Sequence, residues 1–150
     1  MKIAVMGEIH PDGWKIFEEN NLESFELLNF EEHNLKKELS EVDAILLRTA
    51  RLSNDVLSYC NKLKIISRHG VGYDNVNVDY LNKKNIALGI TSTSNAVSVA
   101  EHVLTSFLYL SKNIHLSDKL TREGKFNDKS SLPNFFELYQ KNIVIFGFGR

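Results

Sequence analysis

Short apolar runs alternate with segments of helical spacing along almost the whole chain, and this alternation limits the fold more than any other feature. The runs cover residues 2–6, 25–28, 44–47, 63–67, 86–90 and 142–146. Near-continuous apolar strands separated by helices are typical of a parallel sheet that is covered on both faces. The pattern therefore predicts an α/β fold.

Between the first five runs, apolar residues recur at helical spacing. They predict short helices around residues 14–17, 35–39 and 56–57, with Ser53 as a cap of the third. A further helix over residues 78–83 is expected to be capped by Asp74 or Asn77.

A longer helix is predicted after residue 90, beginning at Ser94 or Asn95. Its apolar residues follow the i, i+3, i+4 spacing of one buried stripe: Ala96, Val99, Ala100, Val103, Leu104, Phe107 and Leu108. The pattern is interrupted near Lys112 and Asn113, and a second helical stretch is expected to end at Gly124.

Composition narrows the class of protein and of partner. The 150 residues carry a net charge of −1 with 43% hydrophobic and 25% charged residues, which is typical of a globular domain. We therefore expect no nucleic-acid partner and, without a run of about 18 apolar residues, no membrane partner. The single cysteine, Cys60, and five scattered histidines predict no metal site, a buried thiol and a reducing, cytoplasmic location.

Two predicted strands end in residues suited to anion binding. The run 63–67 leads into a loop that contains Gly70 and Gly72, whose backbone N–H groups can converge on an anion, and the run 44–47 ends at Arg48. If the two strands are neighbours, the Arg48 guanidinium lies at the same edge and can bind a carboxylate. The alternatives are an ion pair between Arg48 and Asp43 or another surface acid, and a simple turn at the glycines.

The last apolar run leads into Gly147-Phe148-Gly149-Arg150. A buried strand followed by Gly-x-Gly opens many dinucleotide-binding units, although an ordinary turn is the alternative. Because so apolar a strand needs covering helices, we expect the chain to stop inside a second domain. The predicted organisation is a complete domain over 1–124, a linker over 125–141 and the start of a truncated domain over 142–150.

Four blocks in order carry a resemblance to a known family. They are Leu47-Arg48-Thr49, the loop from Arg68 to Val76, the helix start from Asn95 to His102, and Gly147 to Arg150. Together they resemble the D-isomer specific 2-hydroxyacid dehydrogenases, and within them the phosphoglycerate dehydrogenase branch. The resemblance implies a flavodoxin-like substrate domain, joined to a Rossmann domain that binds NAD, in an oxidoreductase that interconverts D-2-hydroxy acids and 2-oxo acids by hydride transfer.

The resemblance also implies roles for individual residues. Val71 and Gly72 would bind the substrate carboxylate, Arg48 would face the substrate, and Val71 would also lie beside the nicotinamide. Val103, where many members carry threonine, would lie against the cofactor, and the pyrophosphate would be met by Gly147, Gly149 and Arg150. The residue that selects NAD over NADP lies about 20 positions past the glycines, so NADP stays open.

No catalytic residue is expected within the chain. In this family the arginine, carboxylate and histidine that perform the chemistry would follow Arg150, so the chain alone is expected to be inactive, and the full-length protein to be a homodimer. The main alternative is a non-catalytic, NAD-binding relative of the corepressor type that acts in protein recognition. A receiver module is disfavoured because Arg48 stands where its phosphate-accepting aspartate would be.

Overall fold

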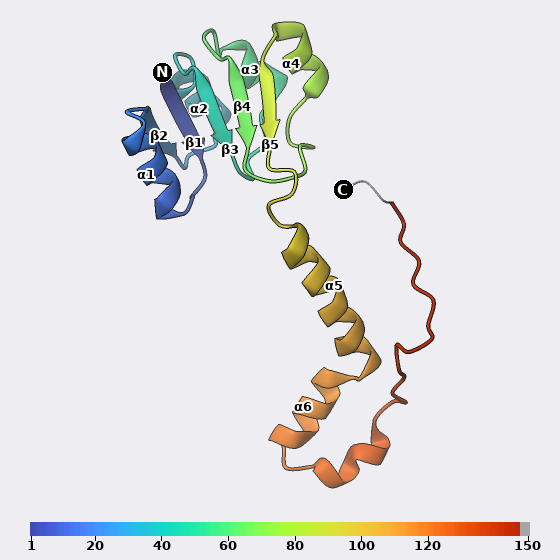
Figure 1. Cartoon of the computed structure of the whole chain (residues 1–150). Helices are drawn as coiled ribbons and strands as arrows, with labels where there is room; N and C mark the ends of the chain where they lie inside the picture. The colour runs from blue at the N-terminus through green and yellow to red at the C-terminus, as the bar shows by residue number, and fades with distance from the viewer. Residues whose placement is uncertain (148–150) are drawn as a thin grey trace. The chain divides into compact units, whose positions relative to one another are not determined.

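The chain forms two compact units in a computed structural model that describes residues 1–147 (Figure 1). The first unit is Met1–Ser92 and the second is Thr93–Arg150. The first contains the whole sheet, whereas the second contains helices and irregular chain.

The first unit is built on a parallel sheet of five strands. Their order is β2-β1-β3-β4-β5, and every neighbouring pair is parallel. The strands are β1 (Lys2–Met6), β2 (Glu23–Leu27), β3 (Ala44–Leu47), β4 (Ile65–Arg68) and β5 (Ala87–Ile90). The first five predicted runs match them within two residues, which confirms the α/β prediction.

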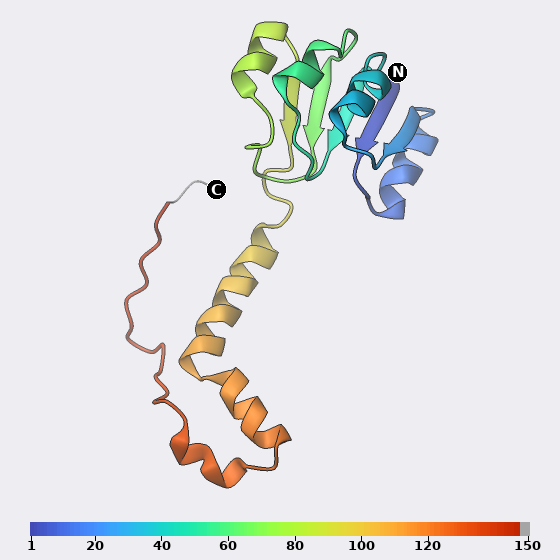
Figure 2. The same cartoon turned by 180° about the vertical axis from the view of Figure 1, so that it is seen from behind.

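Four short helices connect the strands: α1 (Pro11–Glu19), α2 (Glu32–Glu38), α3 (Asn54–Ser58) and α4 (Val78–Lys84). The chain moves one way along the sheet from β1 to β2 and the other way from β2 to β5. Right-handed crossovers therefore place α1 on one face and the other three helices on the opposite face. In Figure 2, α2 and α3 lie in front of the sheet.

The core lies between the sheet and the helices α2, α3 and α4. Its fully buried side chains include Met6, Leu39, Ile45, Ile66 and Leu81. Such close packing fixes the strand ends, and so fixes the origins of the loops that follow them.

Local capping defines where the helices begin. Ser53 Oγ accepts a hydrogen bond from Val56 N at 3.1 Å, and Asn77 Oδ1 accepts one from Tyr80 N at 3.1 Å. The predicted caps Ser53 and Asn77 are therefore confirmed, whereas Asp74 makes no capping hydrogen bond within the described chain.

Cys60 is buried just after α3, as predicted for a small core residue. Burial raises the pKa of its thiol to about 11. The thiol is thus protonated at neutral pH and is a poor nucleophile.

The second unit begins with α5 (Ala96–Ser111) and α6 (Ile114–Arg122), followed by a 3₁₀ helix, η1 (Phe126–Ser131). Asn113 separates the first two helices with a left-handed φ of 47°, and Gly124 follows α6 with φ 68°. The predicted interruption and the predicted stop at Gly124 are both confirmed.

The predicted burial of the α5 stripe is wrong. Val103 is 44% exposed and Leu104 is 58% exposed, although both lie on the predicted apolar face. Within its own unit, the end of α5 is held by a hydrogen bond from Phe136 N to Ser111 O at 3.1 Å. Helical periodicity identifies an apolar face, but it does not say what covers that face.

The segment 142–146 differs from the predicted strand. It carries no strand assignment, and Val144 and Phe146 are 87% and 104% exposed. A strand requires a hydrogen-bonded neighbour, and the described part of the second unit contains no other strand. Among residues 1–147, no helix is long and apolar enough to cross a membrane.

Candidate functional site at the carboxyl edge of the sheet

The carboxyl edge of the sheet contains a point where the chain direction along the sheet reverses. The strands β1 and β3 are neighbours, but the chain leaves them toward opposite ends of the sheet. Ligands of open α/β sheets bind in the crevice outside the carboxyl ends at such a point. Arg48 follows β3 there, and its backbone N–H donates to Met6 O at 3.2 Å.

The Arg48 side chain is exposed and is directed by the loop after β1. Its Nη1 donates to Glu8 O at 2.9 Å. Within the described chain the guanidinium forms no ion pair, so donors remain available for an anion. The predicted proximity of Arg48 to the glycine loop depended on the two strands being neighbours, and β3 does pair with β4.

The glycine loop after β4 is fixed on both sides. His69 N donates to Leu47 O at 2.8 Å, and Gly70 O accepts from Thr91 N at 3.2 Å. In the described part of the chain, the next two N–H groups, those of Val71 and Gly72, donate to no protein acceptor. Two consecutive free amides in an anchored, exposed loop can hold one carboxylate.

Arg68, the last residue of β4, is a site residue that sequence reasoning missed. It lines an open hollow of about 230 Å³ together with Thr49, Gly72, Asp74 and Asn75. Its Nη1 donates to His69 O, and its buried Nε has no partner among the described residues. The register that pairs Arg68 with Leu47, immediately before Arg48, is visible only in the structure.

Gly70 leaves the space that the Arg68 side chain occupies. A Cβ at position 70 would lie 2.5 Å from Arg68 Nη1 and 2.9 Å from its Cζ. At Gly72 a Cβ would meet only Asp74 Oδ2, at 3.8 Å. A side chain at position 70 is therefore disfavoured by the φ of 156° and by the Arg68 guanidinium, which would have to move, whereas neither obstacle exists at position 72.

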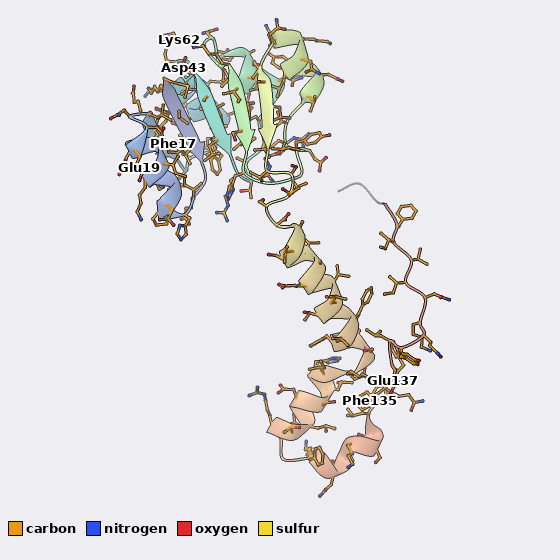
Figure 3. All side chains as sticks on the ribbon, in the orientation of Figure 1. Phe17, Glu19, Asp43, Lys62, Phe135 and Glu137 are labelled. Atoms are coloured by element: carbon orange, nitrogen blue, oxygen red, sulfur yellow. The ribbon has the colours of Figure 1, made fainter. Side chains whose placement is uncertain are left out.

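The alternative role for Arg48, an ion pair with Asp43, is wrong. Asp43 lies at the amino edge of the sheet, where its carboxylate accepts from Lys64 Nζ at 2.8 Å and from Lys2 N at 2.9 Å. These hydrogen bonds lower the pKa of Asp43, that from Lys64 most. Figure 3 labels Asp43 and Lys62 at this edge.

The family follows from comparison with known proteins. Residues 3–149 match the family model described as D-isomer specific 2-hydroxyacid dehydrogenase, catalytic domain. The chain belongs to this family. The resemblance noted in the four sequence blocks is thus confirmed.

Relatives and solved structures agree with this assignment. D-3-phosphoglycerate dehydrogenase of Methanocaldococcus jannaschii is 31% identical over an alignment of 152 positions, which covers 100% of this chain but 28% of that protein. An NAD-dependent formate dehydrogenase of Staphylococcus aureus in complex with NAD is 27% identical, with a TM-score of 0.71 over 87% of this chain and 44% of that one.

A third comparison, at 21% identity, concerns the fold alone. The NADPH-dependent glyoxylate/hydroxypyruvate reductase of Sinorhizobium meliloti, in complex with NADP and malonate, has a TM-score of 0.83 over 99% of this chain and 46% of that one. The chain therefore spans less than half the length of each of these three proteins.

The residues predicted to contact the cofactor are divided between the two units. Val71 belongs to the first unit, whereas Val103 and Gly147 belong to the second. Gly147 has φ 89°, as a tight turn requires. Gly149 and Arg150 lie outside the described residues. Residues 1–147 also contain no group of three or more His, Cys, Asp or Glu side chains placed to hold a metal ion.

Proposed function

We propose that the intact protein is an NAD-dependent oxidoreductase that interconverts a D-2-hydroxy acid and its 2-oxo acid. The observation that carries this proposal is the pair of free backbone N–H groups of Val71 and Gly72, in the loop after the strand that pairs with the one preceding Arg48. Membership of the D-isomer specific 2-hydroxyacid dehydrogenases supports it independently.

In this proposal the carboxyl edge binds and orients the acid. The amides of Val71 and Gly72 donate to the substrate carboxylate, and Arg48 faces the substrate from the neighbouring strand. The arginine, carboxylate and histidine that carry out the chemistry would follow Arg150. For this reason we propose that the 150 residues alone are inactive.

One observation on the chain's own residues supports dinucleotide binding. Around Gly147, a Cβ would meet no heavy atom within 4 Å, so its backbone is open to close approach by a pyrophosphate. We assign Gly147, Gly149 and Arg150 to the pyrophosphate, and Val71 and Val103 to the rest of the cofactor. The bound cofactor supplies or accepts the hydride. We propose NAD, with NADP as the alternative that the test below distinguishes.

Arg68 favours a substrate with a second anionic group. Its guanidinium borders the 230 Å³ hollow beside Gly72 and forms no ion pair within the described chain. The relative from Methanocaldococcus jannaschii is named for a substrate of this kind, 3-phosphoglycerate. We therefore place phosphorylated or dicarboxylic 2-hydroxy acids ahead of simple ones.

The remaining expectations stay predictions. They are a substrate domain over 1–124 with its crossover helix, a linker over 125–141, and a Rossmann domain that starts at 142. A reducing, cytoplasmic location, a homodimer, and the absence of nucleic-acid and membrane partners also stay predictions.

The test is reduction of 2-oxo acids by the intact protein, followed as loss of NADH or NADPH absorbance. Glyoxylate, hydroxypyruvate and 3-phosphohydroxypyruvate form the substrate panel. We expect turnover with NADH and the highest kcat/KM for the phosphorylated acid. Binding of NADH without turnover of any acid would contradict the enzyme assignment and favour the corepressor type.

A further inference from the structure

One residue, Asn75, joins the two loops of the candidate site. Its side-chain Nδ2 donates to Ala50 O at 2.7 Å, and its backbone carbonyl accepts from Leu52 N at 3.2 Å. Ala50 and Leu52 follow Arg48 after β3, whereas Asn75 follows Gly72 after β4. Asn75 is therefore bound twice, once as donor and once as acceptor, to the loop that carries the arginine.

Asn75 lies between two hollows at the carboxyl edge of the sheet. It lines the 230 Å³ hollow and also a second hollow of about 470 Å³, which lies between the loop at Arg51 and the start of α4. The hydrogen bond from His69 N to Leu47 O is the last one in the pairing of β3 with β4. The two hydrogen bonds of Asn75 lie beyond it, between the loops that follow these strands. Without the Asn75 side chain, the segment after Arg48 would keep the backbone bond from Leu52 N and lose the bond at Ala50 O.

Stability alone does not explain an asparagine at this position. Its Oδ1 is buried and accepts no hydrogen bond from the described part of the chain. The unpaired Oδ1 disfavours the folded state and offsets the hydrogen bond that Nδ2 donates to Ala50 O, so the side chain adds little net stability. The contribution of Asn75 is therefore the geometry of the two loops.

We propose that Asn75 is a positioning residue, which sets the separation between Arg48 and the amides of Val71 and Gly72. The inference rests on the proposed function and deepens it. A carboxylate gains from both groups only when their spacing is fixed, and untethered loops are more mobile than the strands they follow. Asn75 acts through the loops and needs no contact with the substrate.

The test compares Asn75→Leu with a matched control, Asn77→Ala, in the intact protein. Leucine keeps the branched shape and the number of side-chain heavy atoms, and it removes the side-chain tether. We expect KM for the 2-oxo acid to rise about tenfold, with kcat changed less than about twofold, because binding of the carboxylate is lost equally in the ground and transition states. The melting temperature should change little, because removal of the unpaired acceptor Oδ1 offsets the loss of the hydrogen bond to Ala50 O.

Asn77→Ala provides the opposite pattern. It removes the cap of α4, the hydrogen bond from Tyr80 N, without touching the Ala50 tether. We expect a lower melting temperature and an unchanged KM. An unchanged KM in Asn75→Leu overturns the inference, and so does a KM that rises in both variants in step with lost stability.

Amide hydrogen exchange separates this inference from the proposed function. Amides of residues 49–52 should exchange faster in Asn75→Leu than in the wild type, and unchanged exchange overturns the tether. If the wild-type protein reduces no 2-oxo acid with either cofactor, the proposed function fails and the substrate-positioning role fails with it. Exchange then decides whether Asn75 holds the two loops together.

Discussion

The two edges of the same sheet differ in how their charges are paired. At the amino edge, Asp43 is bonded to Lys64 and to Lys2 N, and Lys62 forms an ion pair with Glu41. At the carboxyl edge, Arg48 and Arg68 form no ion pair among the described residues. The amino edge thus satisfies its own charges, whereas the carboxyl edge leaves positive charge available to a ligand.

The backbone shows the same difference. Asp43 N donates to Lys2 O at 2.9 Å and Lys64 N to Asp43 O at 2.8 Å, which continues the strand pairing at the amino edge. At the carboxyl edge, the amides of Val71 and Gly72 have no acceptor within the described chain. These amides lie in an exposed loop, so a ligand can accept their hydrogen bonds without displacing a protein acceptor.

The largest expected effect comes from removing the free charge at the carboxyl edge. Arg48→Ala in the intact protein should lower kcat/KM for a 2-oxo acid about 10- to 150-fold, because a charge-assisted hydrogen bond contributes roughly 1.5–3 kcal/mol. The melting temperature should not fall, since Arg48 is exposed. Steady-state kinetics of Arg51→Ala, an exposed arginine of the same loop, should differ from wild type less than about twofold. Equal losses in both variants would show a general charge effect instead.

A smaller effect is expected from crowding Arg68. Gly70→Ala places a methyl group against the guanidinium, and such overpacking costs about 1–3 kcal/mol. The arginine can move aside, so we expect a cost near the lower end of that range. About 1.4 kcal/mol corresponds to a tenfold lower kcat/KM. Gly72→Ala, which meets no close atom, should bind substrate better than Gly70→Ala does. Kinetics that rank the two variants in the other order would contradict the account of Arg68.

At the amino edge the expected effect is on stability, and it depends on pH. The pKa of Asp43 is lowered by the hydrogen bonds from Lys64 and Lys2 N, so the folded state binds its proton less tightly than the unfolded state. The stabilisation is present above about pH 4, the ordinary range of an aspartate, and is lost as the pH falls through the lower pKa of the folded state.

Asp43→Asn should therefore lower the melting temperature at pH 7, with a difference from wild type that shrinks below about pH 4. Thermal unfolding followed by circular dichroism at several pH values measures this difference. Activity at neutral pH should be unchanged. A loss of activity without a loss of stability would place function at the amino edge and remove the contrast between the edges.

The smallest effect is expected for Lys62→Met. The ion pair with Glu41 raises the pKa of Lys62, but both side chains are more than half exposed, and surface pairs contribute little. The melting temperature should change less than in Asp43→Asn, and added salt should reduce the difference further. A larger change than in Asp43→Asn would mean that the exposed pair of Lys62 and Glu41 stabilises this edge more than the hydrogen bonds of Asp43 do.

The sequence predicted the sheet well because each strand is an apolar run that one domain buries. It also located the loop at Val71 and Gly72, since glycines after a strand mark a close approach to the backbone. The burial of α5 and the strand at 142–146 could not be predicted in the same way, because burial and strand pairing need partners that local pattern does not reveal. Arg68 was missed because its role arises from strand register, which pairs it with Leu47.

The hydrogen bonds between the two loops could not be predicted from the sequence either. Nothing in the pattern around Asn75 indicates that its side chain reaches Ala50, 25 positions earlier in the chain. Asn77, in contrast, was correctly assigned as a cap because capping depends only on residues of its own helix.

The most direct test of the central claim is an NMR titration of the isotopically labelled intact protein with oxalate, an unreactive analogue of a 2-oxo acid. We predict saturable shifts of the backbone amides of Val71 and Gly72 and of the Arg48 guanidinium, with no shift at Asp43 or Lys64. Shifts confined to the amino edge would contradict the account. So would a protein that reduces 2-oxo acids while the amides of Val71 and Gly72 stay unperturbed at saturating oxalate.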